Sequence, residues 1–159
     1  MSGTVPSSPN FQFLAKHDPV LVRHAALAER YVFDDANSAL IKLRQFGELL
    51  SQCCAATVGM VLEPRDSFLD ILNRLRSGGV IDYQVANLFH GLRKIGNEAA
   101  HGSTDDRRAA LHQLQMARKL AVWFHKVQAD GRLQPPEQSF QGELETILRD
   151  IADAMWQAA

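Results

Sequence analysis

The fold of this chain is decided by the stretch Leu88-Phe-His-Gly-Leu-Arg-Lys-Ile-Gly-Asn-Glu-Ala-Ala-His-Gly102. Apolar and small residues recur in and just before it at steps of three and four, which places them on one helix face: Val85, Leu88, Phe89, Leu92, Gly96 and Ala99. Gly102 is typical of a residue that ends a helix. The sequence therefore predicts an amphipathic helix that begins after Asp82 and ends at Gly102.

A polar column lies beside this apolar face, because Arg93, Asn97 and His101 are four residues apart. Our first expectation is structural: the three side chains form hydrogen bonds where the fourth and fifth helices of the chain meet. A second interpretation is a binding site for an anion or a partner segment. A third is catalysis, with the imidazole as a general base that titrates near neutrality.

Helical periodicity continues through the rest of the chain, and no segment alternates convincingly as a β-strand does. Helices are predicted from Pro19, after an Asp18 cap, to about Val32, from Ala39 to Val58, from a cap at Asp66 or Ser67 to Leu75, and after Ser103–Asp106 to about Ala129. The predicted fold class is all-α, an antiparallel helical bundle of about five helices with a trailing amphipathic helix.

The sequence predicts four consecutive regions. Residues 1–10 are expected to be a flexible lead-in, 11–130 the helical bundle, 131–139 a linker with two adjacent prolines, and 140–159 an amphipathic helix. The apolar stripe of that last helix consists of Leu144, Ile147, Leu148, Ile151 and Met155. We expect the stripe to begin a longer helical segment or to dock on the bundle, since exposing it is unfavourable by roughly 25 cal/mol per Å².

Composition excludes several classes of protein. With 17 Lys and Arg against 18 Asp and Glu, the net charge is −1, unlike the basic balance of a dedicated nucleic-acid binder. No apolar run approaches the roughly 18 residues that a membrane span needs, and the N-terminus lacks the pattern of a signal peptide. Cys53 and Cys54 are adjacent, so they are unsuited to pairing with each other, and we expect a reduced, cytoplasmic protein.

Motifs for several kinds of chemistry are absent from the sequence. There is no glycine-rich phosphate loop, no zinc-ligand spacing, no acidic calcium loop and no Gly-x-Ser-x-Gly turn. We therefore expect no cofactor, no metal and no nuclease or ATPase activity in this chain.

Other charged residues offer weaker candidates. Arg44 and Glu48 are spaced for an i,i+4 ion pair, or for a polar tie to Arg93 or Asn97. Two dibasic pairs lie on the last predicted helix of the bundle and are either solvated or in contact with a nucleic-acid backbone: Arg107 with Arg108, and Arg118 with Lys119.

Four segments carry a resemblance to a known family: Asn10–Leu14, Ala39–Glu48, Val85–His101 and Lys119–His125. They resemble the N-terminal helical domain of type I restriction enzyme R subunits, the motor and endonuclease subunits, in a helical family related to HEPN proteins. The resemblance covers roughly residues 10–128, and Leu92–His101 is its most specific part.

The resemblance implies that the chain is a fragment of a larger ATP-dependent, DNA-translocating nuclease, in which it serves as a non-catalytic accessory domain. The implied partners are other domains or subunits of a restriction-modification complex, DNA through the full-length protein, or a second copy in a homodimer; no membrane is implied.

The alternative is a HEPN-type ribonuclease or nucleic-acid-binding module acting as a dimer, and a third reading is a simple oligomerisation bundle. HEPN ribonucleases carry an Arg, a polar residue and then a His about four to six residues further along. Here seven residues separate Arg93 from His101, and Lys94 is followed by the apolar Ile95. The departure speaks against RNA cleavage and leaves the fold expectation unchanged.

Overall fold

The computed structural model describes residues 8–102 and 105–131, and within them the fold is all-α, as predicted. These residues form a short 3₁₀-helix and five α-helices and contain no strand: η1 (Gln12–Lys16), α1 (Pro19–Tyr31), α2 (Ala36–Thr57), α3 (Phe68–Ser77), α4 (Tyr83–His101) and α5 (Arg107–Ala129). None of these helices has the length and hydropathy needed to cross a membrane. The short helix η1, of five residues, was not predicted from the sequence.

Helix starts follow the capping chemistry expected from the sequence. Side chains of Asp18, Asp35, Asp82 and Asp106 accept hydrogen bonds from backbone N–H groups in the first turns of α1, α2, α4 and α5. At α3 the cap is Ser67, which forms a reciprocal capping box with Asp70. Carboxylates and a hydroxyl thus satisfy amide groups that the helices leave without partners.

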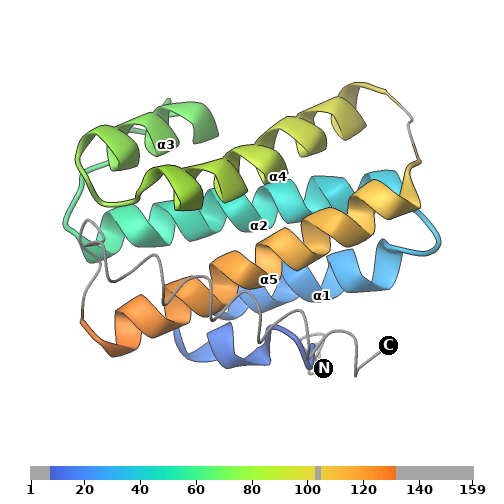
Figure 1. Cartoon of the computed structure of the whole chain (residues 1–159), viewed down its shortest axis with the longest axis horizontal. Helices are drawn as coiled ribbons and strands as arrows, with labels where there is room; N and C mark the ends of the chain where they lie inside the picture. The colour runs from blue at the N-terminus through green and yellow to red at the C-terminus, as the bar shows by residue number, and fades with distance from the viewer. Residues whose placement is uncertain (1–7, 103–104, 132–159) are drawn as a thin grey trace.

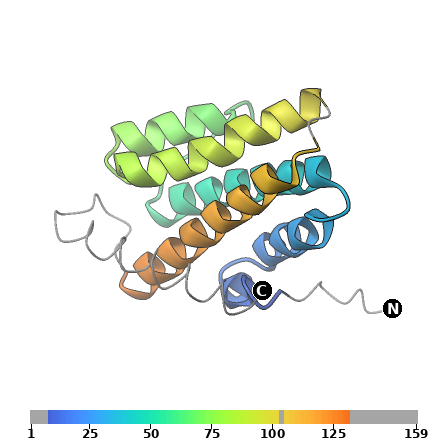
Figure 2. The same ribbon diagram turned by 45° about the vertical axis from the view of Figure 1, so that its right-hand side comes forward.

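Helix α2 is the centre of the bundle. It packs against α1 on one side, against α3 and α4 on the other, and against α5. Figure 1 shows α1 and η1 below α2, α3 and α4 above it, and α5 in front, and Figure 2 shows the same arrangement after a turn. One apolar core is therefore shared by all five α-helices, with Leu43, Phe46 and Leu50 of α2 fully buried in it.

Two glycines set the distance between α2 and α4. A Cβ at Gly96 of α4 would overlap with the Cβ of Arg44 on α2 and would lie only 3.0 Å from its Cγ. A Cβ at Gly47 of α2 would lie 3.1 Å from both Leu92 of α4 and Phe68 of α3. The backbones of α2 and α4 therefore lie close together, and a larger side chain at either position would push them apart.

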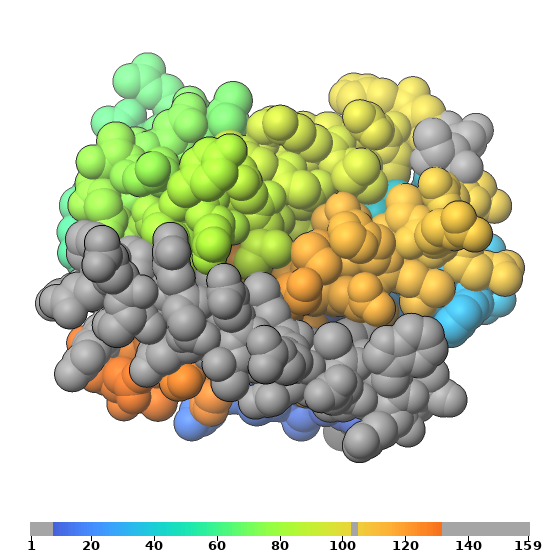
Figure 3. All heavy atoms as spheres, in the orientation of Figure 1, coloured from blue at the N-terminus to red at the C-terminus, as the bar shows by residue number. Residues whose placement is uncertain are grey.

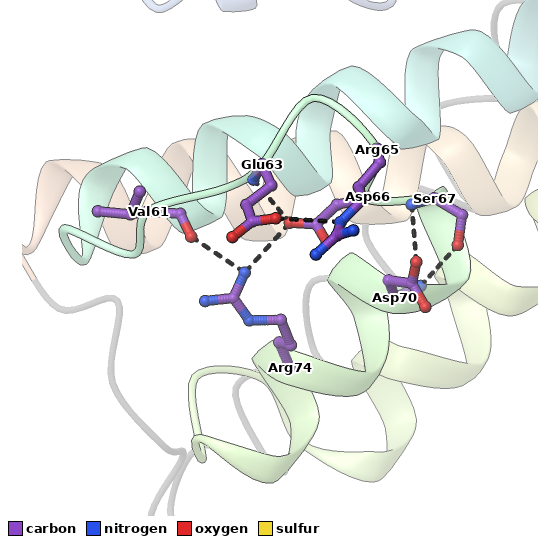
Figure 4. A network of polar contacts seen from close by, with 7 residues as sticks. All are labelled: Val61, Glu63, Arg65, Asp66, Ser67, Asp70 and Arg74. Atoms are coloured by element: carbon purple, nitrogen blue, oxygen red, sulfur yellow. Dashed lines mark hydrogen bonds and ion pairs between the residues drawn. The ribbon is translucent and has the colours of Figure 1, made fainter.

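The loop after α2 positions α3. It runs back along the bundle, so that α3 points the same way as α2, while α4 returns in the opposite direction (Figures 1 and 4). Arg74 of α3 holds the loop by donating to the Val61 carbonyl at 3.0 Å and to Asp66 Oδ2 at 3.3 Å. Figure 4 shows this network next to the Ser67–Asp70 capping box. Phe68 then enters the core edge-on to Phe89 of α4.

The two ends of α4 compare differently with the sequence analysis. The helix starts after Asp82 and ends at His101, as predicted. Gly102, however, is extended, with φ −158° and ψ 162°, so the helix does not end in a left-handed glycine. The left-handed residue of this junction is Asp105, with φ 38°. The expected linker over 131–139, apart from residue 131, and the amphipathic helix over 140–159 lie outside the described residues, as does most of the lead-in.

The close approach at Gly96 yields a stability prediction. Gly96→Ala should lower the free energy of unfolding by about 1–3 kcal/mol, because the new methyl group overpacks the contact with Arg44. In an open helix the same change would raise stability by roughly 1 kcal/mol, so the sign alone is informative. Denaturant unfolding of the single variant and of Gly96→Ala with Arg44→Gly measures the coupling; a stabilised single variant would contradict the close approach.

Candidate functional site

The polar column of α4 is not joined by hydrogen bonds among the described residues. Arg93 is half-buried and donates through Nε to Nδ1 of His90, at 3.4 Å, one turn earlier on the same helix. Asn97 is half-buried and His101 is exposed at the end of α4, and within residues 8–102 and 105–131 neither side chain makes a hydrogen bond. Burial, with the nearby charges of Arg93 and Lys94, lowers the pKa of His90.

The α4–α5 junction is instead held from the start of α2. Asn37 donates through Nδ2 to the Gly102 carbonyl at 3.3 Å and accepts at Oδ1 from the Asp105 N–H at 3.1 Å. Asp105 in turn accepts at Oδ1 from the N–H of Ala36, at 3.2 Å. In its left-handed conformation, Asp105 directs both its backbone N–H and its side chain at α2. Among the described residues, Asn37 thus makes the junction hydrogen bonds that we had expected from the polar column of α4.

Arg107 reinforces the same end of the bundle. Its Nη2 donates to the Phe33 carbonyl at 2.9 Å, and its guanidinium lies 5.8 Å from the centre of the Phe33 ring. Phe33 is 60% exposed, so the contact forms at the surface. This arginine, a predicted nucleic-acid contact, thus joins α5 to the loop between α1 and α2.

Arg118 fixes the N-terminal segment to α5. Its Nε donates to the Asn10 carbonyl at 3.0 Å, and Asn10 itself donates to Glu29 of α1 at 3.2 Å. The buried hydroxyl of Ser8 also bonds to Glu29. Burial lowers the pKa of Arg118 and Glu29 opposes that effect. Arg118 is therefore committed to an internal contact, whereas Arg108 and Lys119 make no hydrogen bond or ion pair with any described residue.

Two histidines far apart in the sequence meet at the lower edge of the bundle. His17, just after η1, and His125 of α5 approach at 3.0 Å between Nε2 and Nδ1. Phe13 packs edge-on to His125, and Phe124 packs edge-on to His17. Burial lowers the pKa of both imidazoles; for His17 the charges of His125 and then Lys16 act in the same direction, and for His125 that of Lys16 does. The pair therefore favours the neutral form in the folded state.

Arg44 and Glu48 lie together on α2. Their Nη1 and Oε1 atoms are 3.9 Å apart and both side chains are about 30% exposed, so the pair contributes only a few tenths of a kcal/mol. The aliphatic stem of Arg44 runs past Gly96. Within the described residues, the Arg44 guanidinium makes no hydrogen bond to Arg93 or Asn97.

The described residues contain no group of three or more His, Cys, Asp or Glu side chains that could hold a metal ion. Cys53 and Cys54 are free thiols, and Cys54 is fully buried. Burial raises the pKa of Cys53 to about 11 and raises that of Cys54 as well, which disfavours the reactive thiolate.

Comparison with known proteins identifies the family. A family model described as a domain of unknown function, DUF4145, matches residues 26–129. The chain belongs to the DUF4145 family. This DUF4145 chain is also 34% identical over 120 residues to the type I restriction enzyme EcoKI endonuclease subunit of Escherichia coli (strain K12). That alignment covers 74% of the chain and 10% of the relative, so the chain spans about a tenth of that protein's length. No solved structure matches.

Neither the junction role of Asn37 nor the pairing of His17 with His125 is evident from the sequence of this DUF4145 domain. Asn37 lies at the start of α2, where its place in the sequence indicates only a local role at the helix end. Its contacts with Gly102 and Asp105 span 65 and 68 residues, and the two histidines are 108 residues apart. Such contacts require a knowledge of helix packing that no local spacing contains.

Asn37 provides a direct comparison with Asn97. Asn37→Ala removes the hydrogen bonds to the Gly102 carbonyl and the Asp105 N–H and should lower the free energy of unfolding by about 1–2 kcal/mol. Asn97→Ala is the matched control and should change it by less than about 0.5 kcal/mol, because Asn97 makes no hydrogen bond with any residue that the structure describes. Chemical denaturation of both variants decides; the reverse order would restore the polar column of α4 as the junction.

The histidine pair predicts a pH dependence of stability. Because folding lowers both pKa values below their ordinary value of about 6.5, the unfolded chain takes up protons first as the pH falls. The Tm should therefore fall between pH 7.5 and pH 5.5. The fall should be clearly smaller in His17→Gln with His125→Gln, and unchanged in the control His112→Gln. An equal fall in the double variant and the wild type would exclude the pair as its cause.

Proposed function

We propose that this DUF4145 chain is a non-catalytic interaction domain of a type I restriction endonuclease subunit, part of a larger ATP-dependent enzyme that translocates DNA. The supporting observation is its 34% identity, over 120 residues that make up 74% of the chain, with the EcoKI endonuclease subunit. The aligned segment makes up 10% of the relative, which fits an accessory role for so small a part. The partners we infer are other domains or subunits of a cytoplasmic restriction-modification complex used in phage defence.

The distribution of polar contacts supports an interaction role over a catalytic one. The well-formed contacts of Asn37, Arg107 and Arg118 connect loops and helices to one another. His101, the candidate general base, is exposed at the end of α4, and Arg93 is engaged with His90. An acid–base mechanism needs groups within hydrogen-bond reach of one reacting atom, and this arrangement does not supply them.

The second candidate is a HEPN-type ribonuclease that acts as a dimer. In its favour, the fold is an all-α bundle in which Arg93 and His101 share α4. A second copy could bring two such helices together and assemble a site that one copy lacks. The spacing of the two residues and the engagement of Arg93 by His90 speak against it.

The proposal predicts binding without catalysis. The tagged chain should retain the other subunits of a type I restriction complex from the same source in an affinity pull-down. The same preparation should leave single-stranded RNA intact, with and without Mg²⁺, and should not hydrolyse ATP.

Two results would overturn this prediction. RNA cleavage that is abolished by His101→Ala, in a variant that melts at the same temperature as the wild type, would establish the ribonuclease. A chain that folds but retains none of the restriction subunits would remove the docking role.

A further inference from the structure

Helix α5 contains no acidic residue in its 23 positions. It carries five cationic side chains, Arg107, Arg108, Arg118, Lys119 and Lys126, and two histidines. A surface helix ordinarily mixes the two signs of charge, and a net charge of −1 for the whole chain gives no indication of this concentration. The imbalance makes α5 the most cationic element among the described residues.

The structure divides these cations into two groups. In each dibasic pair the first arginine is held internally, Arg107 by the Phe33 carbonyl and Arg118 by the Asn10 carbonyl. The second member, Arg108 or Lys119, has no hydrogen bond or ion pair with any part of the chain that the structure describes, and neither has Lys126. Successive residues of a helix point about 100° apart, which explains this division.

Arg108, Lys119 and Lys126 lie on one line along α5. Lys119 lies 11 residues after Arg108, and Lys126 lies 18 residues after Arg108. These separations are about three and five complete helical turns. His112 and the exposed Gln115 fall on the same side, opposite the buried face that includes Ala117, Ala121 and Phe124. We call Arg108, His112, Gln115, Lys119 and Lys126 the α5 stripe.

Among the described residues, no acidic side chain forms an ion pair with the stripe. The ion pairs of the described residues join Arg44 to Glu48, Arg65 to Glu63 and Arg74 to Asp66, and none involves α5. Many of the remaining carboxylates cap helices at the ends of the bundle. Arg108 is exposed, and Lys119 and Lys126 are half-buried side chains whose long stems can reach solvent. Figure 3 shows the first half of α5 at the molecular surface.

We propose that the α5 stripe binds the phosphate backbone of double-stranded DNA. The inference deepens the proposed function, on which it rests, because a subunit that translocates DNA offers such a partner. From Arg108 to Lys126 the stripe spans about 27 Å, which approaches the length of one turn of duplex DNA, about 34 Å. Cationic and amide side chains that contact phosphate groups fix the position of a protein on the duplex. Such contacts do not distinguish one base sequence from another.

The test uses the full chain and three proteins of known charge. The stripe variant is Arg108→Ala, Lys119→Ala and Lys126→Ala. The matched control is Arg23→Ala, Arg30→Ala and Arg76→Ala, which removes three exposed cations from α1 and α3 and so gives the same net charge. Binding of a fluorescent 30-base-pair duplex is measured by anisotropy at several salt concentrations, with single-stranded RNA of equal length as competitor. Melting temperatures are measured in parallel.

The wild type and the control should bind the duplex with similar, strongly salt-dependent affinity. The stripe variant should bind on the order of 100-fold more weakly at 0.1 M salt, and the slope of log K against log salt should fall by about two to three. Its Tm should match that of the wild type, because the three side chains lack partners in the described structure.

Three results would overturn the inference. The first is equal loss of DNA binding in the stripe variant and the control, which would mean that only net charge matters. The second is a preference for the RNA competitor over the duplex. The third is a wild type that does not bind DNA while the stripe variant melts at a lower temperature, which would show that the stripe holds an acidic segment of the chain itself. Pull-down of restriction subunits by the wild type separates the two ideas: a wild type that retains the subunits but does not bind DNA rejects only the stripe.

Discussion

The close approach of α2 and α4 is the constraint on which the rest of the bundle depends. Gly96 lets the α4 backbone lie against the stem of Arg44, and Gly47 makes room for Leu92 and Phe68 on the same side of α2. Since α2 also contacts α1, α3 and α5, its distance to α4 sets the space that every other core side chain fills. Small residues at the contact thus convert two amphipathic helices into the central pair of the fold.

The same contact explains why the described residues of the polar column of α4 are not joined to one another. Arg93 and Asn97 flank Gly96 on α4, where the neighbouring helix presents the stem of a second arginine, Arg44. The carboxylate next to it, Glu48, is directed at Arg44 along α2. An imidazole that acts as a base is usually oriented by a further polar group, and His101 at the exposed end of α4 has none among the described residues. Close packing against Arg44 therefore leaves Arg93 and Asn97 separated from Glu48 in the part of the chain that the structure describes.

Local chemistry made most of the helix boundaries predictable, whereas contacts between distant segments were not. Asp18, Asp82 and the acidic turn before α5 identified helix starts, because a cap acts on amide groups two or three residues away. The end of α4 was predictable only in part. The helix ends where Gly102 predicted, but the chain then continues through extended backbone at Gly102 and a left-handed Asp105. Hydrogen bonds to α2 maintain that conformation of Asp105. The spacing between a cap and the amide groups that it bonds holds no information about which loop the end of a helix will contact.

The dibasic pairs of α5 show the same limit of local sequence patterns. From sequence alone all four residues are equivalent candidates for a nucleic-acid contact. Because the two pairs are 11 residues apart, about three helical turns, both have the same orientation in the bundle. Arg107 and Arg118 are therefore both directed at neighbouring carbonyl groups, and they fix α5 at two points to segments from the N-terminal part of the chain. Arg108 and Lys119 then lie on a helix whose rotation is already set, so the binding of a charged partner that we propose would cost little backbone freedom.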